Sequence, residues 1–233
     1  MQTPWKDAPV KAVLFDWEDT LLNVRATREA FLVIQWQSFL DELLHIPAKV
    51  YVKTVQDALS ESAPATAYVK VCRHLKLSPV LAEMFYQDYH QHHGGAPRLF
   101  PGALNLLRHL SALYQTGLIC NGTAPQVQQS LRDSGIAPYL HHVRVSDPSG
   151  TAKPSAEIFH RALHDLGLKA EQAVYVGDDL VMDMDAATHA GLHAIWKRPP
   201  GHPLRHPPHV SAVIDDIRDL PHALRDLAGI PAG

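Results

Sequence analysis

The chain has few cysteines, no long apolar segment and no block of basic residues. Its two cysteines, Cys72 and Cys120, lie far apart, so we expect no disulfide framework and predict a reducing, cytoplasmic location. No apolar run approaches the roughly 20 residues that cross a bilayer, and residues 1–7 contain no apolar signal segment. The missing Lys/Arg block and a net charge of −3 argue against nucleic-acid and membrane-surface partners.

Apolar residues, by contrast, are plentiful. The chain has 233 residues, of which 46% are hydrophobic, and this is enough for one large domain or a domain with a sizeable insertion. The composition is not typical of a disordered protein. We therefore expect a full hydrophobic core.

Six short apolar runs are typical of strands in a parallel sheet. Their hydrophobicity is nearly continuous, which favours strands buried on both faces. They are Ala12–Phe15, Leu118–Cys120, Val143–Val145, Ala173–Val176, Ala194–Trp196 and Ala212–Ile214. Helical patterns lie between them, including one with leucines three residues apart at Leu104, Leu107, Leu110 and Leu113. The alternation predicts an α/β fold with a doubly wound parallel sheet.

Residues 23–97 break this alternation. They contain no convincing strand, and Pro47, Pro64 and Pro79 mark expected breaks between helices. Apolar residues in helical patterns support this interpretation, examples being Phe31, Ile34, Leu44, Val69, Cys72 and Leu75. We predict a core domain of residues 1–22 and 98–233 and an inserted helical cap domain of residues 23–97. Periodicity alone does not distinguish an inserted cap from helices that simply pack on the sheet.

Polar side chains follow four of the predicted strands. They are Asp16, Asn121, Ser146 with Asp147, and Asp178 with Asp179. In open α/β sheets the ligand crevice lies outside the carboxyl ends of the strands, so we expect these residues to share one site. Asp16 opens the segment Asp16–Thr20, in which a second acid, Glu18, lies two residues on. Such carboxylates can attack an electrophile, hold a divalent cation or move a proton.

Four segments then stand in a characteristic order: Asp16–Thr20, Leu118–Gly122, Lys153–Pro154 and Val176–Asp183. Together they resemble the haloacid dehalogenase-like (HAD) hydrolase superfamily. That family has an Asp-x-Asp-x-Thr motif, a Ser or Thr ending the second strand, a Lys, and a Gly-Asp-x-x-x-x-Asp motif. The similarity covers roughly residues 10–22 and 98–197, and the intervening insert has the size of the family's helical cap. The resemblance implies a Rossmann-like core with that cap.

The resemblance also implies a Mg²⁺-dependent phosphatase that acts on a small phosphorylated metabolite through an aspartyl phosphate. Asp16 would be the nucleophile, Glu18 the general acid and base, and Lys153 the cation that neutralises Asp16 and a phosphoryl oxygen. Mg²⁺ would bind Asp16, the Glu18 backbone carbonyl and Asp178, while Asp183 would hold a metal-bound water or orient Lys153. Thr20 would orient the first loop. The substrate phosphate would lie at Cys120, Asn121 and Gly122.

Two positions depart from the family pattern. Glu18 stands where the family has Asp, and its carboxyl is one methylene farther from the backbone. Cys120 stands where the family has Ser or Thr, and a thiol is a poorer hydrogen-bond donor, although Asn121 and Gly122 still offer an amide and a backbone N–H. Cys120 as a nucleophile is disfavoured, because no histidine is paired with it in sequence.

These departures motivate a second hypothesis, a catalytically weak or silent protein that binds a phosphorylated ligand or a protein partner. A dehalogenase needs no metal, and the acidic pair Asp178 and Asp183 argues against it. A phosphomutase remains an alternative. The sequence indicates neither the particular substrate nor the oligomeric state.

Overall fold

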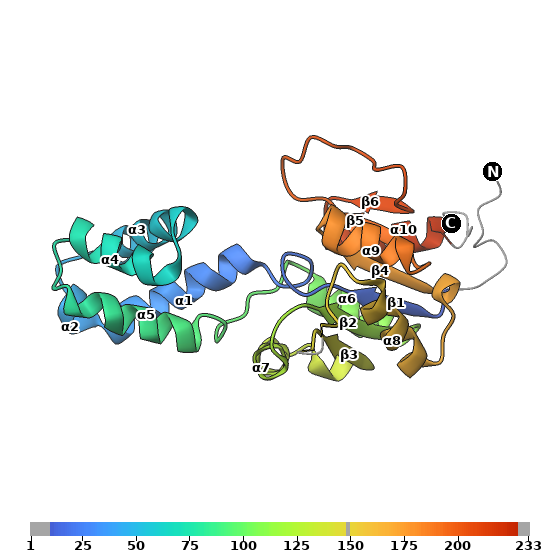
Figure 1. Cartoon of the computed structure of the whole chain (residues 1–233), viewed down its shortest axis with the longest axis horizontal. Helices are drawn as coiled ribbons and strands as arrows, with labels where there is room; N and C mark the ends of the chain where they lie inside the picture. The colour runs from blue at the N-terminus through green and yellow to red at the C-terminus, as the bar shows by residue number, and fades with distance from the viewer. Residues whose placement is uncertain (1–9, 148–149, 228–233) are drawn as a thin grey trace. The chain divides into compact units, whose positions relative to one another are not determined.

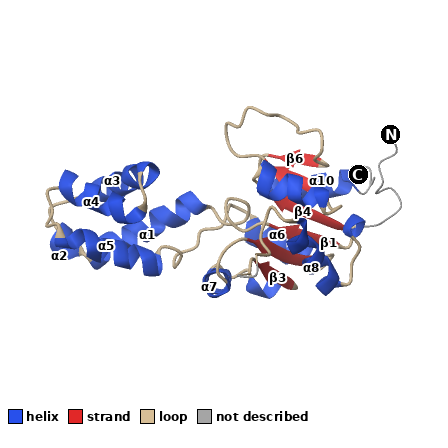
Figure 2. Cartoon of the chain, in the orientation of Figure 1, coloured by secondary structure: helices blue, strands red, loops and turns tan. Residues whose placement is uncertain are grey.

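The computed structural model describes residues 10–147 and 150–227, which fall into two compact units. The α/β unit comprises the described residues up to Asn23 and from Leu99 onward, and the helical unit comprises Val24–Arg98. In the described part of the chain, every named strand belongs to the α/β unit (Figure 2). The division into a core domain of residues 1–22 and 98–233 and a cap domain of residues 23–97 stays a prediction.

The α/β unit is built on a six-stranded parallel sheet of order β3-β2-β1-β4-β5-β6 (Figure 1). The strands are β1 (Ala12–Phe15), β2 (Gln115–Cys120), β3 (His142–Val145), β4 (Ala173–Gly177), β5 (His193–Lys197) and β6 (Ala212–Ile214). Each contains one of the six predicted apolar runs. The predicted fold class, an α/β parallel sheet with a helical insert between its first two strands, is confirmed.

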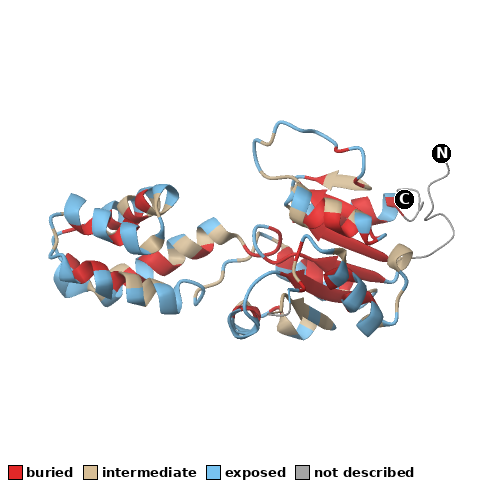
Figure 3. Ribbon diagram, in the orientation of Figure 1, coloured by how far each residue is buried: buried red, intermediate tan, exposed pale blue. Residues whose placement is uncertain are grey.

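Both faces of the central strands are buried (Figure 3). On one face, Leu14 of β1 and Tyr175 of β4 pack with Phe159 and other apolar residues of the helices that follow. Val13 and Phe15 alternate with Leu14 and are also fully buried, as the two-residue period of a strand requires. Continuous burial explains why these strands read as uninterrupted apolar runs.

The remaining elements of the α/β unit lie between the strands or, for the last two, after β6. They are α6 (Ala103–Leu110), α7 (Ala124–Asp133), η1 (Ala137–Tyr139), α8 (Ala156–Leu166), η2 (Ala170–Gln172), the π-helix η3 (Leu180–Asp185), α9 (Ala186–His189), η4 (Ile217–Asp219) and α10 (Leu220–Leu227).

The leucine stripe predicted for α6 was partly wrong. Leu107 and Leu110 are buried, whereas Leu104 is 40% and Leu113 is 62% exposed. A strict three-residue spacing drifts around a helix of 3.6 residues per turn, so its ends cannot share a face. The buried stripe instead has i, i+3, i+4 and i+7 spacing. Its members are Ala103, Leu106, Leu107 and Leu110.

The helical unit contains α1 (Val24–Ser38), α2 (Leu40–Leu43), α3 (Ala48–Glu61), α4 (Pro64–His74) and α5 (Val80–His92). Pro47 and Pro79 precede α3 and α5, and Pro64 begins α4, so the predicted helix breaks are confirmed. Proline suits these positions because its missing N–H has no intrahelical partner there.

The apolar pattern of this unit was only partly predicted. Phe31 and Cys72 are buried as expected, but Ile34, Leu44 and Val69 are 47%, 75% and 48% exposed. In α1 the buried face instead includes Gln35, a polar residue that the apolar count passed over. No helix among the described residues is long and apolar enough to span a bilayer.

Candidate active site

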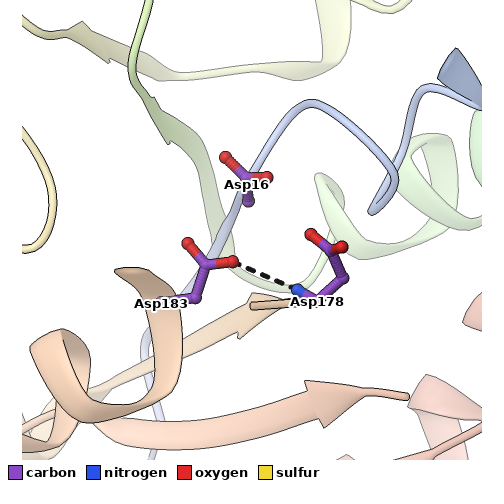
Figure 4. Close-up of side chains that lie close together, drawn as sticks. All are labelled: Asp16, Asp178 and Asp183. Atoms are coloured by element: carbon purple, nitrogen blue, oxygen red, sulfur yellow. Dashed lines mark hydrogen bonds between the residues drawn. The ribbon is translucent and has the colours of Figure 1, made fainter. Parts of the chain in front are cut away.

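Acidic side chains from two strand ends and one helical turn converge in the α/β unit. Asp16 follows β1, and its N–H donates to the Val176 carbonyl of β4 at 2.9 Å. Asp178 follows β4, and Asp183 lies within η3. Figure 4 shows the three carboxyl groups close together, and one oxygen from each lies within 4.8 Å of the other two. Parallel strands bring their carboxyl ends to one edge of a sheet, which is why these distant residues meet.

Lys153 is the cation of this cluster. Its side chain is buried, and Nζ lies 2.5 Å from Asp16 Oδ1 and 2.6 Å from Asp183 Oδ1. It also donates to the Tyr175 hydroxyl at 3.3 Å. A buried ammonium needs such partners, because it has lost its hydration. Lys153 therefore links the carboxylates of Asp16 and Asp183.

Asp183 is held on both of its oxygens. Oδ2 accepts from the backbone N–H groups of Asp178 at 3.1 Å and Asp179 at 3.0 Å, the former drawn as a dashed line in Figure 4. Oδ1 accepts from Lys153 and from Tyr175 at 3.2 Å. A Cβ at Gly177 would lie 2.5 Å from Asp183 Cγ, so only glycine admits this close approach. The geometry favours orientation of Lys153 over direct metal binding as the role of Asp183.

Asp178 is less buried and faces the loop that follows β1. Its carbonyl accepts from Trp196 Nε1 at 2.8 Å, and its Oδ1 accepts from Thr20 Oγ1 at 3.4 Å. Thr20 is fully buried. The role predicted for Thr20, to orient the first loop, stays a prediction.

Burial and the repulsion between carboxyl groups both change the acidity of this cluster. Burial, followed by the Asp183 carboxylate, raises the pKa of Asp16 to about 7, although Lys153 acts in the opposite direction. Burial and then Asp183 raise the pKa of Asp178 to about 6. The cluster thus carries more negative charge than Lys153 offsets. A divalent cation would relieve this excess.

The turn after β2 is neutral, and its polar groups bond to residues outside the turn. Asn121 pairs with the Lys153 backbone: its Nδ2 donates to the Lys153 carbonyl at 3.0 Å, and its Oδ1 accepts from the Lys153 N–H at 2.9 Å. The Gly122 N–H donates to Ser146 Oγ at 3.0 Å. We expected both groups to be available to an anion. Phosphate binding at Asn121 and Gly122 stays a prediction, and an anion would have to replace existing hydrogen bonds.

Cys120 and Glu18 differ in exposure. Cys120 is buried at the end of β2, and burial raises the pKa of its thiol to about 12, which keeps it protonated. A protonated thiol is a weak nucleophile, so the geometry gives no support to nucleophilic attack by Cys120. Glu18 is exposed in the loop after β1. Its proposed catalytic role depends on how that loop is held.

Three residues at this site escaped the sequence analysis: Tyr175, Trp196 and Lys197. Tyr175 and Trp196 lie inside apolar runs and were counted as core, although each carries one polar atom that bonds within the site. Lys197 is the last residue of β5, directly after the predicted apolar run Ala194–Trp196, and its side chain is buried. A search for polar atoms at the carboxyl end of every predicted strand would have included Lys197.

Comparison with known proteins identifies the family. Residues 10–191 match the family model described as haloacid dehalogenase-like hydrolase. The chain belongs to the haloacid dehalogenase-like hydrolases. The predictions of the family and of a hydrolase are confirmed.

Individual relatives agree with this assignment. The chain is 28% identical over 196 residues to glyceraldehyde 3-phosphate phosphatase of Methanothermobacter thermautotrophicus, covering 80% of this chain and 84% of that protein. The magnesium-bound structure of the HAD-hydrolase YfnB from Bacillus subtilis matches with a TM-score of 0.67 at 21% identity, over 93% of this chain and 99% of that one. The 2-haloacid dehalogenase of Pseudomonas syringae matches with a TM-score of 0.62 at 22% identity, over 93% and 99%. At these identities the two structures establish the fold alone.

Proposed function

We propose that this hydrolase is a Mg²⁺-dependent phosphatase that forms an aspartyl phosphate on Asp16. The observation that carries the proposal is the position of Lys153 between Asp16 and Asp183, 2.5 Å and 2.6 Å from their oxygens. A carboxylate is repelled by a phosphate dianion, so a carboxylate nucleophile for phosphoryl transfer needs positive charge beside it. Lys153 provides one such charge at the nucleophile.

The donor set suits Mg²⁺. This ion prefers oxygen ligands and is usually held by one or two carboxylates together with waters. Asp16 and Asp178 would supply the carboxylates and Glu18 a backbone carbonyl, while the contacts of Asp183 suit it to orienting Lys153. When bound, the ion would neutralise charge on the phosphoryl oxygens. The pKa values of Asp16 and Asp178 are raised in this site. This supports the view that the site needs more positive charge than Lys153 supplies.

The chain's own residues would carry the two steps. An Asp16 carboxylate oxygen attacks phosphorus, a P–O bond forms, and the P–O bond to the leaving group breaks as the Glu18 carboxyl protonates the departing oxygen. Glu18 then removes a proton from water, whose oxygen attacks the aspartyl phosphate. The P–O bond to Asp16 breaks and inorganic phosphate leaves. Lys153 stabilises the negative charge at Asp16 and a phosphoryl oxygen throughout.

A small phosphorylated metabolite is the proposed substrate class. Several relatives are glyceraldehyde 3-phosphate phosphatases, at 26% to 29% identity over most of the chain. This makes a triose phosphate the first substrate to test. The cytoplasmic location predicted from the sequence stays a prediction.

The second candidate is a weakly active or silent protein that binds a phosphorylated ligand. The neutral turn after β2 favours it, because Cys120 replaces the family's hydroxyl and the Gly122 N–H already donates to Ser146. Glu18 in place of Asp adds to this argument.

A phosphate-release screen separates the two candidates. The panel contains glyceraldehyde 3-phosphate, other sugar and triose phosphates and p-nitrophenyl phosphate, each with Mg²⁺ and with EDTA. The matched control is Asp16→Asn, which keeps the shape of the side chain and removes the nucleophile. We expect release that needs Mg²⁺ and falls by more than about 10³-fold in Asp16→Asn. Release that persists in EDTA would contradict the metal site, and binding of Mg²⁺ and a phosphorylated ligand without turnover would establish the silent alternative.

A further inference from the structure

Lys197 is a buried lysine beside the proposed site that belongs to none of the four sequence motifs. Only two lysines are buried in the described part of the chain, Lys153 and Lys197, and Lys197 is 4% exposed. It ends β5, directly after Trp196, whose indole N–H donates to the Asp178 carbonyl. The mechanism proposed above makes no use of this charge.

The contacts of Lys197 all lie within the α/β unit. Nζ donates to the Asp19 carbonyl at 2.7 Å and lies 3.6 Å from the centre of the Phe100 ring. Burial lowers the pKa of Lys197, and the carboxylates of Asp178, Asp19 and Asp216 oppose that change. An ammonium loses its hydration on burial, and a carbonyl, an aromatic face and nearby carboxylates replace part of it. These contacts fix the end of the side chain in one place.

The carbonyl that Lys197 holds belongs to a turn with an unfavourable backbone. Asp19 has φ of 51°, in the left-handed region that residues other than glycine seldom adopt. Such a conformation persists only where the surroundings hold it. The N–H groups of Leu21 and Leu22 donate to the Trp17 carbonyl at 3.1 Å and 2.9 Å and close the turn. Lys197 holds this turn from the end of β5, by its hydrogen bond to the carbonyl of Asp19. The two residues are 178 positions apart in the sequence.

Glu18 and Thr20 flank Asp19 on this turn. Glu18 is the proposed acid and base, and Thr20 donates to Asp178 at 3.4 Å. We propose that Lys197 is a positioning residue that holds the turn at Asp19 and thereby places Glu18 and Thr20. Lys197 acts through the backbone and does not touch the substrate. The kinetic part of this inference rests on the proposed function, and the structural part does not.

Lys197→Met tests the inference, because methionine keeps a long apolar stem and removes the ammonium. Lys11→Met is the control, since it removes one positive charge from an exposed position just before β1. Hydrogen exchange of the Leu21 and Leu22 amides is measured, with the Asp16 amide as the reference for opening of the sheet. We expect exchange at Leu21 and Leu22 to become at least about tenfold faster in Lys197→Met and to stay unchanged in Lys11→Met.

Kinetics distinguish positioning from a general loss of stability. A displaced Glu18 affects leaving groups that need a proton more than those that do not. We expect Lys197→Met to lower kcat about tenfold for an alkyl phosphate, with a much smaller fall for p-nitrophenyl phosphate and little change in KM. An equal fall for both substrates would contradict the inference.

Wild-type exchange rates at Leu21 and Leu22 in Lys197→Met would overturn the inference. Tighter Mg²⁺ binding without faster exchange would also overturn it, because that result indicates a purely electrostatic effect of Lys197 on Asp178. If Lys197→Met does not fold, Phe100→Leu replaces it, because this change removes the ring and leaves the ammonium. A smaller acceleration at the same amides is then expected, and none would overturn the inference. If the wild type releases no phosphate from any substrate, the proposed function fails while the exchange measurement still decides whether Lys197 holds the turn.

Discussion

The two units each bury a cluster of polar side chains, and the clusters differ in charge. In the helical unit, the Gln35 amide lies at the centre: Oε1 accepts from the hydroxyls of Tyr51 and Tyr68, and Nε2 donates to the Phe85 carbonyl and to Asp88. These bonds, of 2.7 to 2.9 Å, use the full hydrogen-bonding capacity of a neutral amide. In the α/β unit, the Lys153 ammonium contacts two carboxylates, those of Asp16 and Asp183, and a third, that of Asp178, lies beside them.

This difference suggests that one cluster stabilises the packing of its unit and that the other serves a chemical function. The Gln35 amide is neutral and fully bonded, and the one carboxylate among its partners, Asp88, also contacts His92 Nδ1 at 2.9 Å, so this cluster fixes how the helices pack. In the charged cluster, burial and then the Asp183 carboxylate raise the pKa values of Asp16 and Asp178. Perturbed carboxyl groups of this kind gather at functional sites. The following predictions test whether the two clusters differ in function as they do in charge.

The largest expected effect on stability is that of Asp183→Ala. It leaves the Lys153 ammonium with one carboxylate fewer and two backbone N–H groups without their acceptor, so we expect a loss of about 3–5 kcal/mol in the free energy of unfolding. Asp178→Ala should cost less stability but weaken Mg²⁺ binding more, because Asp178 is a proposed direct ligand. Chemical denaturation and Mg²⁺ titration calorimetry measure the two quantities. The reverse ranking in both would show that Asp183 is the ligand and Asp178 the support.

Gln35→Leu should damage the helical unit alone. It leaves the buried hydroxyls of Tyr51 and Tyr68 and the Phe85 carbonyl without their partner, and we expect a loss of about 2–4 kcal/mol in unfolding free energy. Mg²⁺ affinity should not change. Gln37→Leu, an exposed position on the same helix, is the matched control and should change stability little. A large fall in Mg²⁺ affinity in Gln35→Leu would break the separation between the clusters.

Stabilisation by Mg²⁺ should grow with pH. The folded-state pKa values of Asp16 and Asp178, about 7 and about 6, lie above the ordinary value of 3.8. The folded protein therefore binds protons that the unfolded chain releases, and the metal-free protein loses stability as pH rises through this range. Mg²⁺ competes with those protons. We expect Mg²⁺ to raise Tm more at pH 8 than at pH 5.5, as thermal unfolding would show. An equal gain at both pH values would contradict the raised pKa values of Asp16 and Asp178.

The smallest expected effect is kinetic and concerns Glu18. If its longer side chain places the carboxyl poorly, Glu18→Asp should raise turnover of alkyl phosphates severalfold and change p-nitrophenyl phosphate hydrolysis less, because p-nitrophenolate leaves without a proton. Parallel assays of both substrates measure the ratio. A lower rate with both substrates would mean that the site is adapted to glutamate.

Much of the fold was predictable because its signals are local in the sequence. Continuous apolar runs located the strands, and Pro47, Pro64 and Pro79 located breaks between helices. The faces of the helices were less predictable. Ile34 and Leu113 are exposed although they are apolar, since burial depends on which elements pack against a helix.

The candidate site divides in the same way. The order of the four motifs indicated Asp16, Lys153, Asp178 and Asp183, because each follows a strand or precedes a helix in a recognisable pattern. The motifs did not indicate the hydrogen-bond partners of these residues. Tyr175 counted as a core residue, Asn121 was expected to face an anion, and Lys197 was not considered.

The sequence by itself thus determined the order of the elements, the family and the residue types of the charged cluster, because apolar periodicity and motif spacing are properties of short stretches of chain. Only the tertiary structure decided which polar groups satisfy one another. Lys153 meets Asp16 across 137 residues, and Lys197 meets Asp19 across 178. A buried donor must find its acceptor among whatever groups the packing brings within about 3 Å, and no local pattern specifies that neighbour.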